Sequence, residues 1–299
     1  MKKSGFSERK HGLPKRALAL LLLLHPPSLF AQGSLIPPGP PAPVMKTLDQ
    51  VEPRTPVDAV HTPGDFSDQF IISQPGSYYL TTNLVNTGAS YGIYIVTNNV
   101  TLDLNGFSVL GTTNSYTGIY VPNNVACYNV VVRNGTVSGW SALGSYGIES
   151  FARNATFEHL TVCSNRTGLY FHNNTLVQDC VVCSNINNGI YVVGTGCLVL
   201  NNICAGNNSA NAANTAGIYV GNANNRIEGN HVIGTGPAGG GIIIQPATSI
   251  TNNIVIRNSV IGGGANNFSF NVQQIVGPLI TNTVSSFITN ANPWANFSF

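Results

Sequence analysis

A short apolar phrase recurs along the chain: a glycine, then isoleucine or leucine, then tyrosine in most copies. Successive copies begin 21 to 29 residues apart. Self-similarity over about 20–50 residues indicates a stacked repeat, because a single unit cannot bury its own apolar face. The phrase predicts a tight corner at the glycine and an inward side chain at the aliphatic residue. Its copies begin at Gly92, Gly118, Gly147, Gly168, Gly189, Gly217 and Gly241.

A second pattern keeps step with the first: two apolar residues lie five positions apart, with polar residues between them. Each unit therefore has two inward contacts around a polar corner, then a loop, then the Gly-Ile-Tyr strand. Such units, with Asn and Gly at their corners, predict an all-β, single-stranded right-handed parallel β-helix of about eight coils. The regular leucines and helical segment of a leucine-rich repeat are missing. The pairs include Leu104/Val109, Val132/Val137, Phe157/Val162, Val177/Val182, Val199/Cys204, Ile227/Val232 and Val255/Val260.

Stacking assigns roles to the asparagines. Because coils lie about 4.8 Å apart, equivalent residues of successive coils lie one above another. Asn202, Asn230 and Asn258 occupy one corner column. Asparagine tolerates a left-handed backbone and can donate a side-chain hydrogen bond to the next coil. These residues are predicted to be structural.

The third position of the phrase, which is mostly tyrosine, is the one that bears on function. If the Ile and the following Val point inward, the Tyr between them points outward. An outward aromatic column suits the apolar faces of sugar rings, but stacked rings also stabilise a sheet without any ligand. Both interpretations stay open here. The predicted substrate-binding column consists of Tyr94, Tyr120, Glu149, Tyr170, Tyr191 and Tyr219.

Two of the six cysteines occupy equivalent places one coil apart. Cys163 and Cys183 follow Val162 and Val182, and the expected Cα spacing lies within the disulfide range of about 4.4–6.8 Å. We predict a Cys163–Cys183 bridge. The Cys180-x-x-Cys183 pair has no second half, so no metal site is predicted.

The ends differ from the repeat. Residues 1–31 have a basic start, an apolar run and small residues near Ala31, the composition of a secretory signal peptide. We therefore expect an exported protein in the periplasm, outside the cell or on its surface. The predicted organisation is a signal peptide over 1–31, a Pro-rich linker and N-terminal cap over 32–68, the β-helix over 69–267 and an aromatic C-terminal cap over 268–299.

Charge excludes one class of partner. Charged residues form 8% of the chain, about a third of the usual share. After Ala31 we count seven Lys and Arg against ten Asp and Glu. This slightly acidic chain has no basic stripe for a phosphate backbone, so nucleic acid is not an expected partner. No later segment is long and apolar enough to cross a membrane, and a monomer is expected.

Residues 70–299 resemble the right-handed β-helix proteins of the pectate-lyase-like superfamily, especially exported bacterial proteins of unassigned function. The resemblance implies the fold but no reaction, because the superfamily includes enzymes, adhesins and proteins without known activity. The matching segments are Gln74-Pro75-Gly76-Ser77-Tyr78-Tyr79-Leu80, Val100-Thr101-Leu102-Asp103-Leu104-Asn105-Gly106-Phe107, Arg133-Asn134-Gly135-Thr136 and Asn292-Pro293-Trp294-Ala295-Asn296-Phe297.

The polygalacturonase-like and epimerase-like motifs of that superfamily are absent, and the few carboxylates lie in several columns, so calcium has no support and no cofactor is expected. One cluster remains as a catalytic candidate: Arg133, Glu158, His159 and Asp179 fall within two coil spacings on one face. A carboxylate beside a histidine and an arginine could abstract a proton next to a uronate. The same four residues could be two surface ion pairs.

The sequence therefore predicts an exported β-helix that binds a polysaccharide or another cell-envelope glycan and has no identifiable catalytic site. The alternative is a polysaccharide lyase or epimerase that acts on an acidic glycan through the candidate cluster. A second alternative is a structural or adhesin-like surface protein.

Overall fold

The computed structural model describes residues 53–86, 88, 90–281 and 292–299. These residues form 27 strands and no helix, in two sheets of 9 and 18 strands. In this part of the chain no helix is long and apolar enough to cross a membrane. The predicted signal peptide and the part of the predicted linker and N-terminal cap before residue 53 lie outside the described residues.

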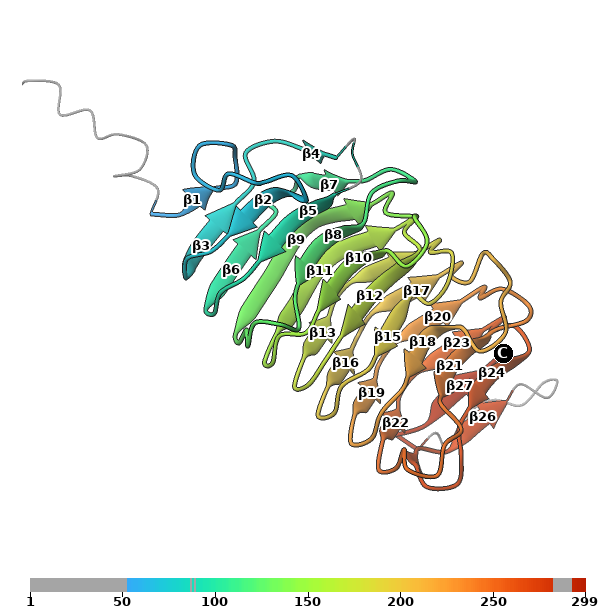
Figure 1. Ribbon diagram of the computed structural model, residues 1–299. Helices are drawn as coiled ribbons and strands as arrows, with labels where there is room; N and C mark the ends of the chain where they lie inside the picture. The colour runs from blue at the N-terminus through green and yellow to red at the C-terminus, as the bar shows by residue number, and fades with distance from the viewer. Residues whose placement is uncertain (1–52, 87, 89, 282–291) are drawn as a thin grey trace, which may run out of the picture. The chain divides into compact units, whose positions relative to one another are not determined.

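The nine-stranded sheet is built from the Gly-Ile-Tyr phrase. Its strands pair in parallel and in chain order, so each coil contributes one strand and the molecule has about nine coils. Figure 1 shows these strands stacked from blue to red. They are β2 (Asp68–Ile72), β5 (Tyr91–Ile95), β8 (Thr117–Val121), β10 (Tyr146–Ser150), β12 (Thr167–Phe171), β15 (Ile190–Val192), β18 (Ala216–Val220), β21 (Gly240–Ile244) and β24 (Asn266–Ser269).

The 18-stranded sheet is built from the paired apolar residues, and each coil contributes two short strands on either side of a corner. In β9 and β11 the two strands are continuous. The parallel β-solenoid predicted from the sequence is confirmed. The strands are β1 (Thr55–Pro56), β3 (Gly76–Tyr79), β4 (Leu84–Val85), β6 (Val100–Asp103), β7 (Ser108–Leu110), β9 (Val130–Ser138), β11 (Thr156–Cys163), β13 (Leu176–Gln178), β14 (Val181–Cys183), β16 (Leu198–Leu200), β17 (Ile203–Ala205), β19 (Arg226–Glu228), β20 (His231–Ile233), β22 (Ile254–Ile256), β23 (Ser259–Ile261), β25 (Ile275–Val276), β26 (Leu279–Thr281) and β27 (Asn296–Ser298).

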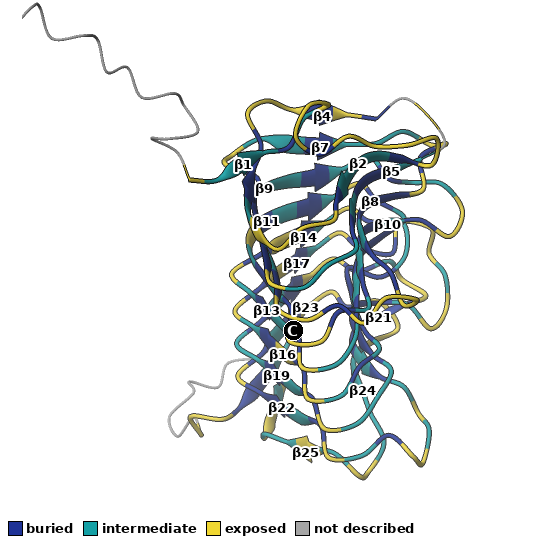
Figure 2. Ribbon diagram, turned by 60° about the vertical axis from the view of Figure 1, so that its left-hand side comes forward, coloured by how far each residue is buried: buried dark blue, intermediate teal, exposed yellow. Residues whose placement is uncertain are grey.

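The core lies between the two sheets. The aliphatic residues of the phrase and the paired residues of the other sheet are fully buried, as predicted; Ile93, Ile119 and Val137 have no exposed surface. Figure 2 shows this burial along the strands, with the exposed residues concentrated in the loops. Each such side chain stabilises the fold by about 1.5–3 kcal/mol relative to exposure.

The phrase glycines are not corners, and that prediction is wrong. Gly118, Gly147, Gly168 and Gly217 lie inside strands and are absent from the residues of positive φ. A Cβ on Gly168 would lie 2.5 Å from the Gly189 carbonyl oxygen and 2.8 Å from Val182 Cγ1. Glycine is therefore required because neighbouring strands and the opposite sheet approach closely at this column.

The asparagine column is confirmed in its hydrogen bonds but not in its backbone. Asn230 Nδ2 donates to Asn258 Oδ1 at 3.0 Å, and Asn202 Nδ2 donates to Asn230 Oδ1 at 3.0 Å. All three asparagines are buried. The left-handed residues are instead the preceding ones, including Asn201 and Gly229. The ladder therefore lies in the interior, where each amide satisfies backbone groups that water cannot reach.

Candidate functional site

The predicted tyrosine column exists and faces outward from the nine-stranded sheet. Tyr94 pairs in register with Tyr120, Glu149 with Tyr120 and Tyr170, and Tyr191 with Tyr170 and Tyr219. The rings are half-buried, except that Tyr219 is 9% exposed. Burial between neighbouring coils therefore covers part of every ring and leaves an accessible remainder on most of them.

The rings contact one another, so the column also supports the sheet. In the coils before Glu149 the rings stack: the Tyr91 and Tyr120 ring centroids lie 4.6 Å apart, and the ring planes differ by 13°. After Glu149 they meet edge to face, as Tyr170 and Tyr191 do at 5.2 Å and 86°. Such pairs contribute about 0.5–1.5 kcal/mol beyond their burial. Self-stacking is thus present, and it leaves the role of the exposed ring faces open.

Three aromatic residues belong to the site although the sequence prediction missed them. Tyr91 and Tyr146 lie three positions before Tyr94 and Glu149, and the Tyr91 and Tyr94 rings stack at 6.0 Å. The Tyr146 and Tyr170 ring centroids lie 4.8 Å apart. Tyr116, in the loop before β8, packs against Tyr91 with ring centroids 5.4 Å apart. The Tyr-Gly-Ile sequence that begins at both Tyr91 and Tyr146 was the signal that could have identified these two residues.

Glu149 is the carboxylate in this aromatic column. Burial raises the pKa of Glu149 to about 7, since a carboxylate is poorly solvated among rings. Its negative charge adds to burial in raising the pKa of Tyr120 and Tyr146, each to about 12. Among the described residues, no hydrogen bond or ion pair joins the Glu149 side chain to another group. The site thus holds a half-buried carboxylate with no protein partner in the described part of the chain.

A cavity of about 140 Å³ opens at Glu149. Tyr116 and Leu143 in its wall are 47% and 87% exposed, which places apolar surface at the rim. The Ser145 hydroxyl is already used, because it donates to the Trp140 carbonyl oxygen at 2.8 Å. The cavity combines aromatic faces with one free carboxylate. Its lining residues are Tyr91, Tyr116, Thr117, Leu143, Gly144, Ser145 and Glu149.

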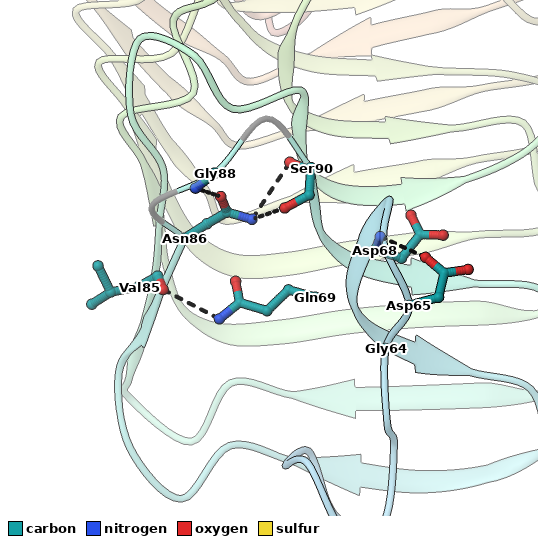
Figure 3. A pocket seen from close by; sticks show the side chains of 8 residues that line it. All are labelled: Gly64, Asp65, Asp68, Gln69, Val85, Asn86, Gly88 and Ser90. Carbon is teal, nitrogen blue, oxygen red and sulfur yellow. Dashed lines mark hydrogen bonds between the residues drawn. The ribbon is translucent and has the colours of Figure 1, made fainter.

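A larger cavity of about 460 Å³ lies near the first coils (Figure 3). Asp68, in register with Tyr91, lines it beside Asp65, whose Oδ1 accepts the Asp68 backbone N–H at 2.9 Å. Burial, together with the charge of Asp65, raises the pKa of Asp68 to about 6. Gln69 lies apart from these carboxylates in Figure 3 and donates to the Val85 carbonyl oxygen.

A third cavity, of about 240 Å³, contains His172. The imidazole stacks on Phe151 with centroids 4.4 Å apart, and its buried Nε2 has no hydrogen-bond partner in the part of the chain that the structure describes. Burial lowers the pKa of His172, because desolvation disfavours the charged ring. The arrangement supplies a neutral imidazole with no carboxylate among the lining residues to form an acid–base pair.

The catalytic candidates lie on the other sheet. Arg133 and Glu158 are register neighbours, but Arg133 Nε lies 3.4 Å from Asp103 Oδ2, and Glu158 Oε2 accepts the Gln178 amide at 3.0 Å. Within the described chain, no hydrogen bond or ion pair joins any two of the four candidates.

His159 and Asp179 are exposed and both have φ 53°. They occupy the same left-handed corner as Asn134 and Asn201. Because Asn, Asp and His are the residues other than glycine that tolerate this backbone best, the corner itself accounts for their presence. The catalytic role of Arg133, Glu158, His159 and Asp179 stays a prediction.

The two register cysteines lie side by side as predicted, Cys163 opposite Cys183. Both are thiols in this structure. The bridge stays a prediction, which peptide mapping without reduction will test. Burial raises the pKa of Cys180 to about 12 and of Cys197 to about 11, which keeps these thiols protonated. In the described part of the chain, no three His, Cys, Asp or Glu side chains gather to hold a metal.

No family model matches the sequence, and no curated protein is significantly similar to it. Among solved structures, the chain is similar to the crystal structure of the Dettilon tailspike protein, with a TM-score of 0.47 and 13% identity. The similarity covers 78% of this chain and 60% of that one. The fold assignment rests on the strand registers of this chain itself.

Proposed function

We propose that the protein binds carbohydrate along the outward column of the nine-stranded sheet, around Glu149. The observation that carries the proposal is the combination in one cavity of exposed Tyr116 and Leu143 with a carboxylate that has no hydrogen-bond or ion-pair partner among the described residues. Ring faces pack against the apolar faces of sugars, and an ionised carboxylate accepts hydrogen bonds from hydroxyl groups. The composition of residues 1–31 supports the export that access to a cell-envelope glycan requires.

The size of the cavity supports a polymer over a small molecule. At about 140 Å³ it is smaller than the 300–1,000 Å³ typical of small-ligand pockets. The tyrosines continue the same surface over neighbouring coils. A chain of sugars can lie across several rings and place one side group in the cavity.

Glycan-array retention tests the proposal with a matched pair of variants. Tyr116→Ala removes an exposed ring of the cavity, whereas Tyr128→Ala removes a 38% exposed ring outside the column. We expect Tyr116→Ala to weaken retention about tenfold and Tyr128→Ala to leave it within about twofold. Absence of retention on every glycan, or equal effects of both variants, would refute carbohydrate binding at this column.

A further inference from the structure

The cavity at Glu149 is lined by a negatively charged side chain and by no positively charged one. In the adjacent coils Glu149 faces Tyr120 and Tyr170, whose ring faces carry partial negative charge. A carboxylate in such surroundings loses water and gains no compensating cation from the described residues.

A second carboxylate repeats this situation in the first coil, in register with Tyr91 beside the column. Asp68 is 6% exposed, and its Oδ1 has no hydrogen-bond partner within the described residues. Its charge is felt by Tyr91 and Tyr94, and the charge of Glu149 also reaches Tyr91. Asp68 lies three coils from Glu149, a stacking distance of roughly 14 Å, and three positions earlier along its strand. The stacked tyrosines between them therefore lie in a negative field from both ends.

We propose that this site selects glycans that carry a free, positively charged amino group, an inference that rests on the proposed carbohydrate binding. An ammonium group interacts favourably with aromatic faces and supplies the cation that Glu149 lacks. The cavity of about 140 Å³ accommodates such a side group while the sugar rings lie along the column. Glu149 contacts the ammonium group, and Asp68 contributes through its field.

The same charges disfavour two other ligand classes. A uronate would bring a second carboxylate against Glu149 in a partly desolvated site, where like charges repel strongly. A neutral N-acetylated sugar can pack against the rings but leaves the ionised Glu149 without a cation. The order of affinity expected from the site is amino sugar, then neutral sugar, then acidic sugar.

Calorimetry with three oligosaccharides tests this order at about pH 7, near the pKa of Glu149: a glucosamine oligomer, its fully N-acetylated counterpart and an oligogalacturonate. We expect the wild type to bind the amino form about tenfold more tightly than the acetylated form. Glu149→Gln should abolish this preference, so that the variant binds the amino and acetylated forms with equal affinity. Asp58→Asn removes one carboxylate from an exposed turn and should retain the preference, which controls for net charge. Circular dichroism confirms that both variants fold.

The outcomes separate this inference from the proposed function. Equal binding of the amino and acetylated forms, a preference for the uronate, or an unchanged preference in Glu149→Gln overturns the amino-sugar selectivity and leaves carbohydrate binding intact. Binding of none of the three oligomers overturns the selectivity too, and glycan-array retention then decides the proposed function separately.

Discussion

At the scale of single residues, the missing side chain of Gly168 determines how closely the two sheets approach. A Cβ there would meet the Gly189 carbonyl oxygen at 2.5 Å, Val182 Cγ1 at 2.8 Å and Asn185 Nδ2 at 2.9 Å. Two of these contacts belong to a packed core and a buried amide, which cannot move freely. We expect Gly168→Ala to lower the free energy of unfolding by about 1–3 kcal/mol, measured by urea denaturation.

The matched control is Gly88→Ala. The nearest atom to a Cβ on Gly88 is Ser90 Oγ at 3.8 Å, an ordinary contact. This variant should unfold within about 0.5 kcal/mol of the wild type. Equal stability of both variants would show that the column tolerates a methyl group and that packing does not require its glycines.

Glu149 links stability to pH. Burial raises its pKa from 4.5 to about 7, so the folded state favours the protonated carboxyl group. The stability that the raised pKa of Glu149 contributes to the folded state is fully present below about pH 4.5 and is lost as the pH rises through about 7. After allowance for partial exposure, ionisation costs about 1–2 kcal/mol. Glu149→Gln should therefore exceed the wild type in stability by this amount at pH 8 and match it at pH 4.

The titratable groups that face Glu149 are tyrosines, Tyr91, Tyr120, Tyr146 and Tyr170, and they stay protonated across this range. Glu158→Gln serves as the control, because it makes the same change at a carboxylate that accepts a hydrogen bond from Gln178. Urea unfolding of both variants between pH 4 and 8 measures the effect. A stability difference for Glu149→Gln that does not change with pH would show that burial among the rings does not govern this group.

At the scale of elements, the interior amide ladders hold successive coils together. Asn185 Oδ1 accepts the Asn165 backbone N–H at 3.0 Å, and its Nδ2 donates to the Val162 carbonyl oxygen at 3.2 Å and to Asn207 Oδ1 at 2.9 Å. Asn185→Ala would leave buried backbone groups without partners, at a cost of about 2–4 kcal/mol. The midpoint of chemical unfolding measures this loss.

Asn187 provides the comparison for this ladder. Among the described residues its hydrogen bonds are made by the backbone, whose N–H donates to the Arg166 carbonyl oxygen at 2.7 Å. Asn187→Ala keeps that bond and should change stability by less than about 0.5 kcal/mol. If Asn185→Ala and Asn187→Ala unfold together, the ladders do not contribute to coil stacking.

The elements also show what sequence can predict. Period-two burial and a repeat of 21 to 29 residues predicted the outward direction of Tyr94 and the inward direction of Ile93, because alternation alone determines them. The interior direction of Asn202 was not predictable in this way. Its place depends on Asn201, which takes the left-handed conformation one position earlier, and such a shift leaves no trace in hydrophobic periodicity.

The sequence predicted only part of the candidate site, and the rest was missed for a related reason. The column from Tyr94 to Tyr219 followed from equivalent positions in successive repeats. Tyr116 and Leu143 enter the cavity from loops of variable length, and the repeat pattern carries no information about where a loop folds. Glu149 was visible as the one carboxylate of the column.

At the scale of the whole molecule, the strand β27 covers the end of the 18-stranded sheet. It pairs with both β23 and β26, and Asn296 extends the buried amide ladder by accepting the Asn258 backbone N–H at 3.0 Å. Deletion of residues 292–299 would expose two parallel strand edges and an unsatisfied amide, and exposed edges pair with other chains. We expect the shortened protein to self-associate, as measured by light scattering after size exclusion.

Phe299→Ala separates the strand edge from exposed apolar surface. The Phe299 ring is 47% exposed, while its backbone N–H donates to the Val260 carbonyl oxygen at 2.9 Å. The substitution removes the ring and keeps that bond and β27, so the variant should remain as monodisperse as the full chain. If Phe299→Ala associates as strongly as the deletion, the ring and not the open edge governs association. If the deleted chain stays monomeric and equally stable, β27 is not needed to close the end of the sheet.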